Sequence, residues 1–345
     1  MRGGTSKGAF FLESDLPGDE TERDALLLAV MGTPDRRQID GVGGAHPLTT
    51  KVAVVSQSQR DDADVEYLFL QLGVDEATIT DRQNCGNMLA AVGPFAVERG
   101  LVTPPDGIAP VRIWMRNTAG LARASFPVAG GSPVYEGDTA ISGVPGTAAR
   151  IDIEFVGVAG GTTGSLLPTG DVVDEVEGVE VSLIDNGMPV VVMRAEDLGV
   201  TGYETCSELE SDARLRERLE EIRLAAGSKM GLGDVTATTI PKLTMLAPPA
   251  GNGHVSTRTF IPHRCHTSIG VLGAVSVATA CLLHESPGAS VTRSPEGDLF
   301  RLEHPTGTMD AIVALTSELP PEVVKAGVVR TARMLMDGIL YPRSY

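Results

Sequence analysis

The stretch Asn84-Cys85-Gly86-Asn87, which leads into the apolar run 88–98, carries the most information about the fold. The run predicts a buried helix, and Cys85 lies where the chain enters it. The first amides of a helix are unpaired and carry the positive end of its dipole, so this position favours a thiolate and can hold a carboxylate. Arg264-Cys265-His266-Thr267-Ser268 stands in the same way before the apolar run 269–283. Two such units predict two related half-molecules around one cleft.

The length of the chain suits two domains, and its composition is that of a soluble globular protein. The chain has 345 residues, of which 42% are hydrophobic and 21% charged, and its 40 glycines indicate many turns and strands. The net charge of −17 argues against nucleic acid or a membrane surface as the main partner, although a local site can still bind a small anion. No apolar run reaches the length of a membrane span, and no secretory signal precedes the first polar motif. We therefore expect a cytoplasmic location.

The four cysteines are Cys85, Cys206, Cys265 and Cys281, and they show neither CxxC pairing nor regular spacing. We therefore expect neither a structural zinc site nor a disulfide framework. No cofactor motif appears either, so we expect a protein without metal or cofactor.

Strands outnumber helices in both halves, which predicts the α+β class with a curved sheet around a helix in each half. The boundary is expected in 162–173, where glycine, threonine and proline interrupt the apolar pattern. One half then spans 1–172, rejoined by the C-terminal segment 326–345, and the other spans 173–325. The chain opens directly on a glycine-rich turn, which suggests that a leading strand is missing. Helices are expected at 20–31 and 208–226, and strands at 9–12, 51–57, 65–74, 111–117, 121–128, 151–158, 179–184, 190–194, 242–247, 255–260, 299–303 and 310–315.

Cys85 and Lys51 are the first candidates for acid/base chemistry. The alternative for Cys85 is a small buried hydrophobe, but its polar neighbours suit a floor where the backbone approaches a ligand, which makes Gly86 and Asn87 candidates for substrate binding. Lys51 precedes an apolar strand, where a lysine is ordinarily a solvated strand end. The functional alternative is a lysine at the mouth of a cleft that pairs with an anion or moves a proton.

Two glycine-rich loops are candidates for holding the carboxylates of a substrate. The loop Gly43-Gly44-Ala45-His46 lies shortly before Lys51, and successive glycines can present backbone N–H groups to a carboxylate. The first turn, with Thr5 and Ser6, lacks the spacing of a nucleotide-binding loop and is followed by a strand. It is interpreted as a cradle for a small anion, with a plain turn as the alternative.

The second polar turn offers a further set of polar side chains. Arg258 is suited to a bidentate pair with a carboxylate, and His266 to positioning a substrate or carrying a proton. Thr267 and Ser268 follow at the helix start. Cys265 is either a second acid/base group or a bystander beside His266. Zinc is a weaker alternative here, because no acidic residue has ligand spacing nearby.

A cysteine and a lysine at one cleft, with helix starts directed at it, predict proton transfer at carbon. One group removes a proton from a carbon acid, a second group returns one elsewhere, and backbone amides stabilise the dienolate between the two steps. This is isomerase or tautomerase chemistry on a small polycarboxylate. The alternative from another class is a non-catalytic accessory protein that binds a polycarboxylate. The segment Glu303-His304-Pro305-Thr306-Gly307 is interpreted as a structural turn between strands.

Several motifs, in order along essentially the whole chain, resemble the family of 2-methylaconitate cis-trans isomerase. The resemblance implies a fold similar to diaminopimelate epimerase: two pseudo-symmetric domains, each a curved, mainly antiparallel sheet around a central helix, with the active site in the cleft between them and no metal or cofactor. The motifs are Met1-Arg2-Gly3-Gly4-Thr5-Ser6-Lys7-Gly8, Ile39-Asp40-Gly41-Val42-Gly43-Gly44, Leu48-Thr49-Thr50-Lys51-Val52-Ala53, Gln83-Asn84-Cys85-Gly86-Asn87 and Ile184-Asp185-Asn186-Gly187-Met188-Pro189.

The resemblance also implies roles for individual residues. Cys85 and Lys51 take the acid/base roles, and carboxylates are held by Thr5 and Ser6, by the loop 43–46 and by the helix start 266–268. Diaminopimelate epimerases use one cysteine from each half, whereas the isomerases are not expected to need a second thiol, so Cys265 ranks below Lys51.

The motif around Arg258, from Ser256 to His266, resembles the branch of the family that acts on 4-oxalomesaconate in gallate degradation. This implies keto-to-enol tautomerisation through a 1,3-proton shift. The close alternative is cis-trans or allylic isomerisation of 2-methylaconitate or another tricarboxylate. A homodimer is the expected assembly.

Overall fold

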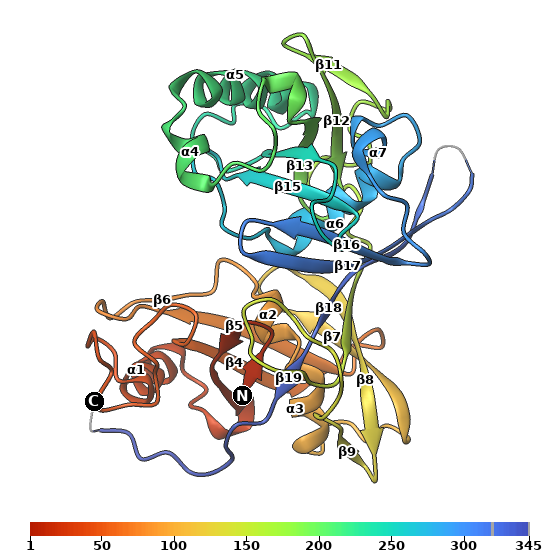
Figure 1. Cartoon of the computed structure of the whole chain (residues 1–345). Helices are drawn as coiled ribbons and strands as arrows, with labels where there is room; N and C mark the ends of the chain where they lie inside the picture. Colours follow the sequence, from red (N-terminus) through yellow and green to blue (C-terminus); the bar gives the residue numbers. More distant parts are fainter. Residues whose placement is uncertain (319–320, 344–345) are drawn as a thin grey trace. The chain divides into compact units, whose positions relative to one another are not determined.

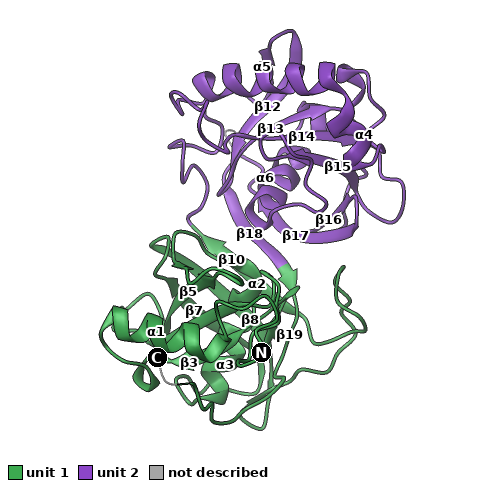
Figure 2. Ribbon diagram, turned by 90° about the vertical axis from the view of Figure 1, so that its left-hand side faces the viewer, with its two compact units in different colours: residues 1–156, 329–345 green, residues 157–328 purple. Residues whose placement is uncertain are grey.

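Apolar strands build a sheet in each half of the chain (Figures 1 and 2). The computed structural model describes residues 1–318 and 321–343. The chain divides into two compact units, residues 1–156 with 329–345 and residues 157–328. Each unit encloses a core of its own, and the predicted α+β class, with mainly antiparallel sheets packed on helices, is confirmed.

The first unit holds a sheet in the order β3-β4-β5-β7-β8-β10. Strands β3 and β4 pair in parallel, as do β5 and β7, and the other neighbours are antiparallel. A second, small sheet joins the beginning of the chain to its end in the order β19-β1-β2. The strands are β1 (Arg2–Gly3), β2 (Ser6–Lys7), β3 (Ala9–Leu12), β4 (Lys51–Gln57), β5 (Val65–Leu72), β6 (Ile79–Thr80), β7 (Gly107–Met115), β8 (Gly120–Ala129), β9 (Ser132–Pro133), β10 (Ile151–Val156) and β19 (Ala332–Arg333).

Helix α1 (Glu20–Met31) follows the short 3-10 helix η1 (Glu13–Asp15) and packs on this sheet. The carboxylate of Asp19 caps it by accepting the amides of Thr21 and Glu22, and Gly32 ends it at φ +77°. Leu27 and Met31 lie in its buried face, in one cluster with apolar side chains of β4 and β5.

The buried helix predicted at 88–98 is interrupted. The structure has α2 (Gly86–Leu89) and α3 (Val92–Glu98), separated by Ala90 and Ala91. Pro94 explains the break, because its ring has no N–H and clashes with the carbonyl group four residues earlier, that of Ala90. Both segments are buried as predicted.

The second unit holds a sheet in the order β11-β12-β13-β14-β15-β16-β17-β18. Strands β13 and β14 pair in parallel, as do β15 and β16, and the other neighbours are antiparallel. The strands are β11 (Asp174–Val176), β12 (Val179–Asp185), β13 (Pro189–Arg194), β14 (Lys242–Ala247), β15 (Val255–Phe260), β16 (Leu299–His304), β17 (Gly307–Leu315) and β18 (Val323–Arg330).

The helices of the second unit include the second predicted buried helix, α6 (Val271–Leu282). Alanine, valine and glycine let it lie against β12, β13, β16 and β17 with nine of its residues buried. The amphipathic helix predicted at 208–226 is divided by Asp212, whose extended backbone ends α4 and whose carboxylate caps α5. The helices are η2 (Glu196–Leu198), α4 (Cys206–Ser211), α5 (Ala213–Lys229), α6 and α7 (Pro287–Val291).

The two units repeat one strand order. Strands β3, β4, β5, β7, β8 and β10 follow one another with the same sequence of parallel and antiparallel pairings as β13 to β18. Helix α1 precedes β4 just as α4 and α5 precede β14, and α2 follows β5 just as α6 follows β15. Cys85 and Ser268 therefore precede corresponding helices.

Candidate active site

The glycines of the first turn bring three segments of the first unit together. A Cβ atom on Gly3 would lie 2.3 Å from the carbonyl oxygen of Asn87. A Cβ atom on Gly8 would lie 2.4 Å from the terminal methyl of Met88 and 2.5 Å from the carbonyl oxygen of Lys51. Only glycine permits such close approach. The turn thus lies against both the start of α2 and the start of β4.

Thr5 and Ser6 each offer a hydroxyl group in this turn. Asn87 Nδ2 donates to Thr5 Oγ1 at 3.0 Å, so the hydroxyl proton of Thr5 is left to donate to a ligand. Ser6 is 3% exposed, and its Oγ has no hydrogen-bond partner within the described residues. A buried hydroxyl without a partner costs free energy that a bound ligand or water would recover.

Lys51 begins β4 and is 7% exposed, so it is not a solvated strand end. Its Nζ donates to Gln71 Oε1 at 2.5 Å and lies 5.0 Å from the centroid of the Phe69 ring. Gln71 Nε2 donates to the carbonyl oxygen of Thr50 at 3.0 Å, which fixes the other amide atom toward Lys51. Within residues 1–318 and 321–343 this ammonium group has neutral neighbours and no ion pair. It is therefore available to an anionic ligand.

Cys85 is the half-buried N-cap residue of α2, and its thiol is free. No side chain caps this helix, so the amides of its first turn, which includes Gly86, are open to an anion. Because α2 has only one turn, its dipole is smaller than the predicted continuous helix would supply. Tyr67 donates its hydroxyl to the carbonyl oxygen of Cys85 at 3.4 Å. Burial, and then the charge of Cys85, raises the pKa of Tyr67 well above its ordinary value, so this hydroxyl stays protonated.

The loop 43–46 is organised by Gln38, which is 2% exposed and which the sequence analysis missed. Gln38 Oε1 accepts the amide of Ala45 at 2.7 Å, and the amide of Gly43 donates to the last turn of α1 at 3.2 Å. Within the described part of the chain, only the amides of Gly44 and His46 in this loop make no hydrogen bond. The predicted row of successive N–H groups is thus reduced to two.

The second polar turn leads into α6 and contains a hydrogen bond between two of its own residues. His266 Nδ1 accepts the amide of Ser268 at 2.9 Å, so the neutral ring carries its proton on Nε2. Burial lowers the pKa of His266, which keeps this ring neutral near pH 7. No side chain caps α6 at Gly270, and twelve residues give the helix a full dipole at its start. This turn offers an imidazole N–H and open amides.

Arg258 lies on β15, and Cys265 lies in the second polar turn itself. Arg258 is 8% exposed, and its Nε donates to the carbonyl oxygen of Glu204 at 2.7 Å. Cys265 is buried, and its amide donates to Glu210 Oε1 at 3.0 Å. Burial raises the pKa of the Cys265 thiol, and the neighbouring Cys206 thiol raises it further. A thiol that stays protonated is a poor base, and the ranking of Cys265 below Lys51 stays a prediction.

His304 was assigned to a structural turn, and the turn between β16 and β17 is confirmed. The structure adds that His304 is 8% exposed and that its Nε2 lies 3.2 Å from Ser268 Oγ. The amide of Thr306 donates to Nδ1 at 3.3 Å, so the neutral ring donates from Nε2 to Ser268. The hydroxyl proton of Ser268 is then left for a ligand. The sequence gives no sign of this contact, because the two residues are distant along the chain.

Lys242 is a further residue that the sequence analysis missed. It begins β14 as Lys51 begins β4, and these strands correspond in the two units. It is half-buried, and burial, followed by the charge of Arg223, lowers its pKa to about 8. Its charge contributes to the lowered pKa of His266. The position of a lysine at the start of an apolar strand, the same signal as at Lys51, would have indicated it.

The predicted site residues thus fall into two sets, and their placement around one cleft stays a prediction. The first unit holds Thr5, Ser6, Gly43, Gly44, Ala45, His46, Lys51, Cys85, Gly86 and Asn87, and the second holds Arg258, Cys265, His266, Thr267 and Ser268. Among the described residues, no group of three or more His, Cys, Asp or Glu side chains is arranged to hold a metal ion. Nor does any helix in that part of the chain have the length and apolarity needed to cross a membrane.

Comparison with known proteins gives matches over nearly the whole chain. The model of the PrpF protein family matches residues 1–343. The (4E)-oxalomesaconate Delta-isomerase of Novosphingobium sp. (strain KA1) is 56% identical over 343 residues, covering 99% of this chain and 96% of that protein. The 4-oxalomesaconate tautomerase of Pseudomonas putida is 56% identical over 342 residues, covering 99% and 94%. A crystal structure of methylitaconate-delta-isomerase superposes with a TM-score of 0.89 at 33% identity, covering 98% and 92%.

Proposed function

The chain belongs to the PrpF protein family, and from this premise we propose that it is an isomerase that converts 4-oxalomesaconate from the keto to the enol form without a cofactor. The reaction is a 1,3-proton shift. The observation that carries the proposal is the packing of the first turn against the segments that bear Lys51 and Cys85. This packing supports a site in which two acid/base groups act beside hydroxyl and amide donors that suit carboxylates.

In the proposed mechanism, one set of groups transfers protons and another set stabilises the negative charge that forms. One of Lys51 and Cys85 removes a proton from the carbon acid, and the other supplies a proton at the second position. The open amides at the start of α2, with the hydroxyl groups of Thr5 and Ser6, stabilise the dienolate that forms between the two steps. Donors that are already in place cost no reorganisation when that charge develops.

An allylic shift on the same substrate is the second candidate, in which the proton returns to carbon instead of oxygen. The equal identity of the Delta-isomerase and tautomerase relatives favours it as the alternative. Methylitaconate-like substrates are less favoured, because the sequence of methylitaconate-delta-isomerase is only 33% identical to that of this chain. Both reactions pass through one dienolate, so the product distinguishes them.

Proton NMR of 4-oxalomesaconate with enzyme in deuterated water tests the proposal. Tautomerisation gives the enol without deuterium at a new carbon, whereas an allylic shift places deuterium on that carbon. Tight binding of the substrate without turnover or exchange would instead indicate the non-catalytic alternative. We also propose that the reaction serves gallate-type aromatic acid degradation in the cytoplasm and that the protein is a homodimer.

Removal of the thiol tests the role of Cys85 directly. Cys85→Ala is expected to lower turnover by roughly 10²- to 10⁴-fold, the range of a single acid/base group, at an unchanged melting temperature. The control is Cys281→Ala, which removes a buried thiol from α6 and is expected to keep the parent rate. Parent-like turnover by Cys85→Ala in the same NMR assay would exclude the proposed mechanism.

A further inference from the structure

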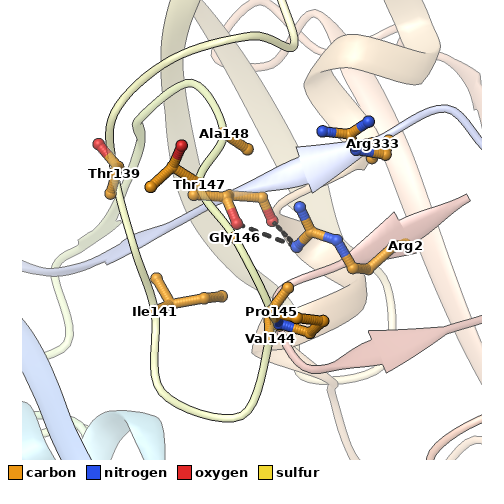
Figure 3. Close-up of a pocket in the computed structure, with 10 residues that line it drawn as sticks. Arg2, Thr139, Ile141, Val144, Pro145, Gly146, Thr147, Ala148 and Arg333 are labelled. Atoms are coloured by element: carbon orange, nitrogen blue, oxygen red, sulfur yellow. Dashed lines mark hydrogen bonds between the residues drawn. The ribbon is translucent and has the colours of Figure 1, made fainter.

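The first unit contains a cavity of about 280 Å³ beside the first turn. One wall is formed by Arg2 of β1 and by Thr331 and Arg333 at β19, and the other by the loop 139–148. Figure 3 shows the two guanidinium groups on one side and Thr139, Ile141 and Thr147 on the other. Thr139 and Ala148 close the loop through two backbone hydrogen bonds of 3.0 Å. One wall therefore rests on the pairing of β1 with β19, and the other is a loop closed by a single pair of backbone hydrogen bonds.

Two positive charges face this cavity from neighbouring strands. Arg2 and Arg333 are direct partners in the antiparallel pairing of β1 with β19, where like charges repel. Arg2 Nη1 donates to the carbonyl oxygens of Gly4 and Thr331 at 2.9 and 3.0 Å, and within the described residues it has no carboxylate partner. Burial, and then the charge of Arg333, lowers the pKa of Arg2. A half-buried cation without a counter-ion is costly, and a bound anion would offset that cost.

The remaining polar groups also match an anion. Within the part of the chain that the structure describes, the amides of Gly146 and Thr147 and the hydroxyl group of Thr139 make no hydrogen bond. Within the described residues, the carboxylate that pairs with one of the two guanidinium groups is that of Glu136, whose side chain is 81% exposed and lies 3.6 Å from Arg333. The described residues that line the cavity thus present donors and positive charge, and none of them is acidic.

We propose that this cavity binds the carboxylate group of a small organic anion. A guanidinium fork matches a planar carboxylate, and the volume lies just below the roughly 300–1,000 Å³ of sites for drug-sized ligands. Thr5 of the candidate active site contacts the loop that forms one wall of the cavity: its hydroxyl accepts from Asn87, and its methyl lies 3.3 Å from the position of a Cβ on Gly143. The carboxylate comes either from an outlying part of the substrate, which rests on the proposed function, or from a separate effector.

Calorimetric titration of the full chain with citrate tests the site without requiring turnover. Arg333→Gln is expected to weaken binding about tenfold, the effect of one charge-assisted contact. Glu136→Gln is expected to strengthen it about threefold, because the competing carboxylate is removed. Arg36→Gln and Glu76→Gln make the same charge changes on the surface of the first unit and are expected to bind as the parent does. Equal affinity of Arg333→Gln and Arg36→Gln, both folded by circular dichroism, would overturn the proposal.

Kinetics with 4-oxalomesaconate distinguish the two sources of the carboxylate. If the substrate supplies it, citrate competes with substrate and Arg333→Gln raises KM. If a separate effector supplies it, citrate changes the rate without competing and Arg333→Gln leaves KM unchanged. Both patterns support the site. Absence of turnover would count against the proposed function alone, since the citrate titration stands independently of it.

Discussion

Lys51 and His304 show how neutral neighbours decide what a polar side chain offers to a ligand. An amide oxygen and a ring face hold the ammonium group of Lys51, so its charge is not cancelled by a carboxylate within the described residues. His304 receives an amide on one nitrogen and donates from the other to Ser268. In each case the partner fixes one direction and leaves a donor for the ligand.

Replacement of His304 separates positioning from simple packing. His304→Leu removes the donor to Ser268, so the serine hydroxyl turns and KM is expected to rise about tenfold with little change in kcat. His304→Gln keeps an N–H group at a similar place and is expected to recover most of the loss. Steady-state kinetics check this. An equal loss in both variants would show that ring packing, not the hydrogen bond, matters.

The lowered pKa of Lys242 makes the stability of the protein depend on pH. Its folded pKa of about 8 lies below the ordinary 10.5, so between these pH values the unfolded chain holds a proton that the folded protein lacks. Stability from this group therefore rises with pH across that window and is lowest below pH 8. Urea unfolding at pH 7.5 and 10 is expected to show a gain for the parent that Lys242→Met lacks. A gain of equal size in the variant would assign the effect to other groups.

At the scale of elements, the sequence predicted most strands and both buried helices, since periodicity and turn residues are local signals. It missed the breaks at Pro94 and Asp212, where a steric clash or a cap overrides an apolar pattern. It also missed Gln38 and His304, because each acts through partners brought close only by folding. The predicted acid/base roles of Cys85 and Lys51 rest on their local sequence and on motif resemblance, whereas their hydrogen bonds depend on the packed structure.

The contact between the first turn and α2 gives a prediction about packing. Gly3→Ala would place a methyl group 2.3 Å from the carbonyl oxygen of Asn87, so it is expected to cost about 1–3 kcal/mol and to lower activity by displacing Thr5. Gly18→Ala meets no atom within 4 Å and is expected to change stability by less than about 0.5 kcal/mol. Urea unfolding measures both. A neutral Gly3→Ala would mean that the turn moves freely away from α2.

At the scale of the whole molecule, the sequence predicted two related halves but not that their strands repeat in the same order. The two polar turns before apolar runs indicated two related halves. The match of parallel and antiparallel pairings did not follow from them, because pairing joins segments far apart in the chain. Within this repeat, a lysine begins each of the corresponding strands β4 and β14.

Separate cores predict that the halves unfold in separate steps. The single tryptophan, Trp114, lies on β7 of the first unit, so its fluorescence reports that unit, whereas far-ultraviolet circular dichroism reports both. We expect the two probes to give different urea midpoints. Trp114→Phe, with the same dichroism curve as the parent, is the control. Coincident transitions would show that the units unfold together.

The pairing of β1 with β19 also bears on biosynthesis. Lys51 and Cys85 emerge from the ribosome long before Ala332 and Arg333, so a nascent chain already carries its proposed acid/base groups while the strand beside Arg2 is still untranslated. The hydrogen bond from the amide of Gly4 to the carbonyl oxygen of Thr331 likewise cannot form until Thr331 has been added to the chain. Messages cut short near their 3′ end would therefore yield polypeptides that keep the reactive side chains but leave the opening turn unanchored.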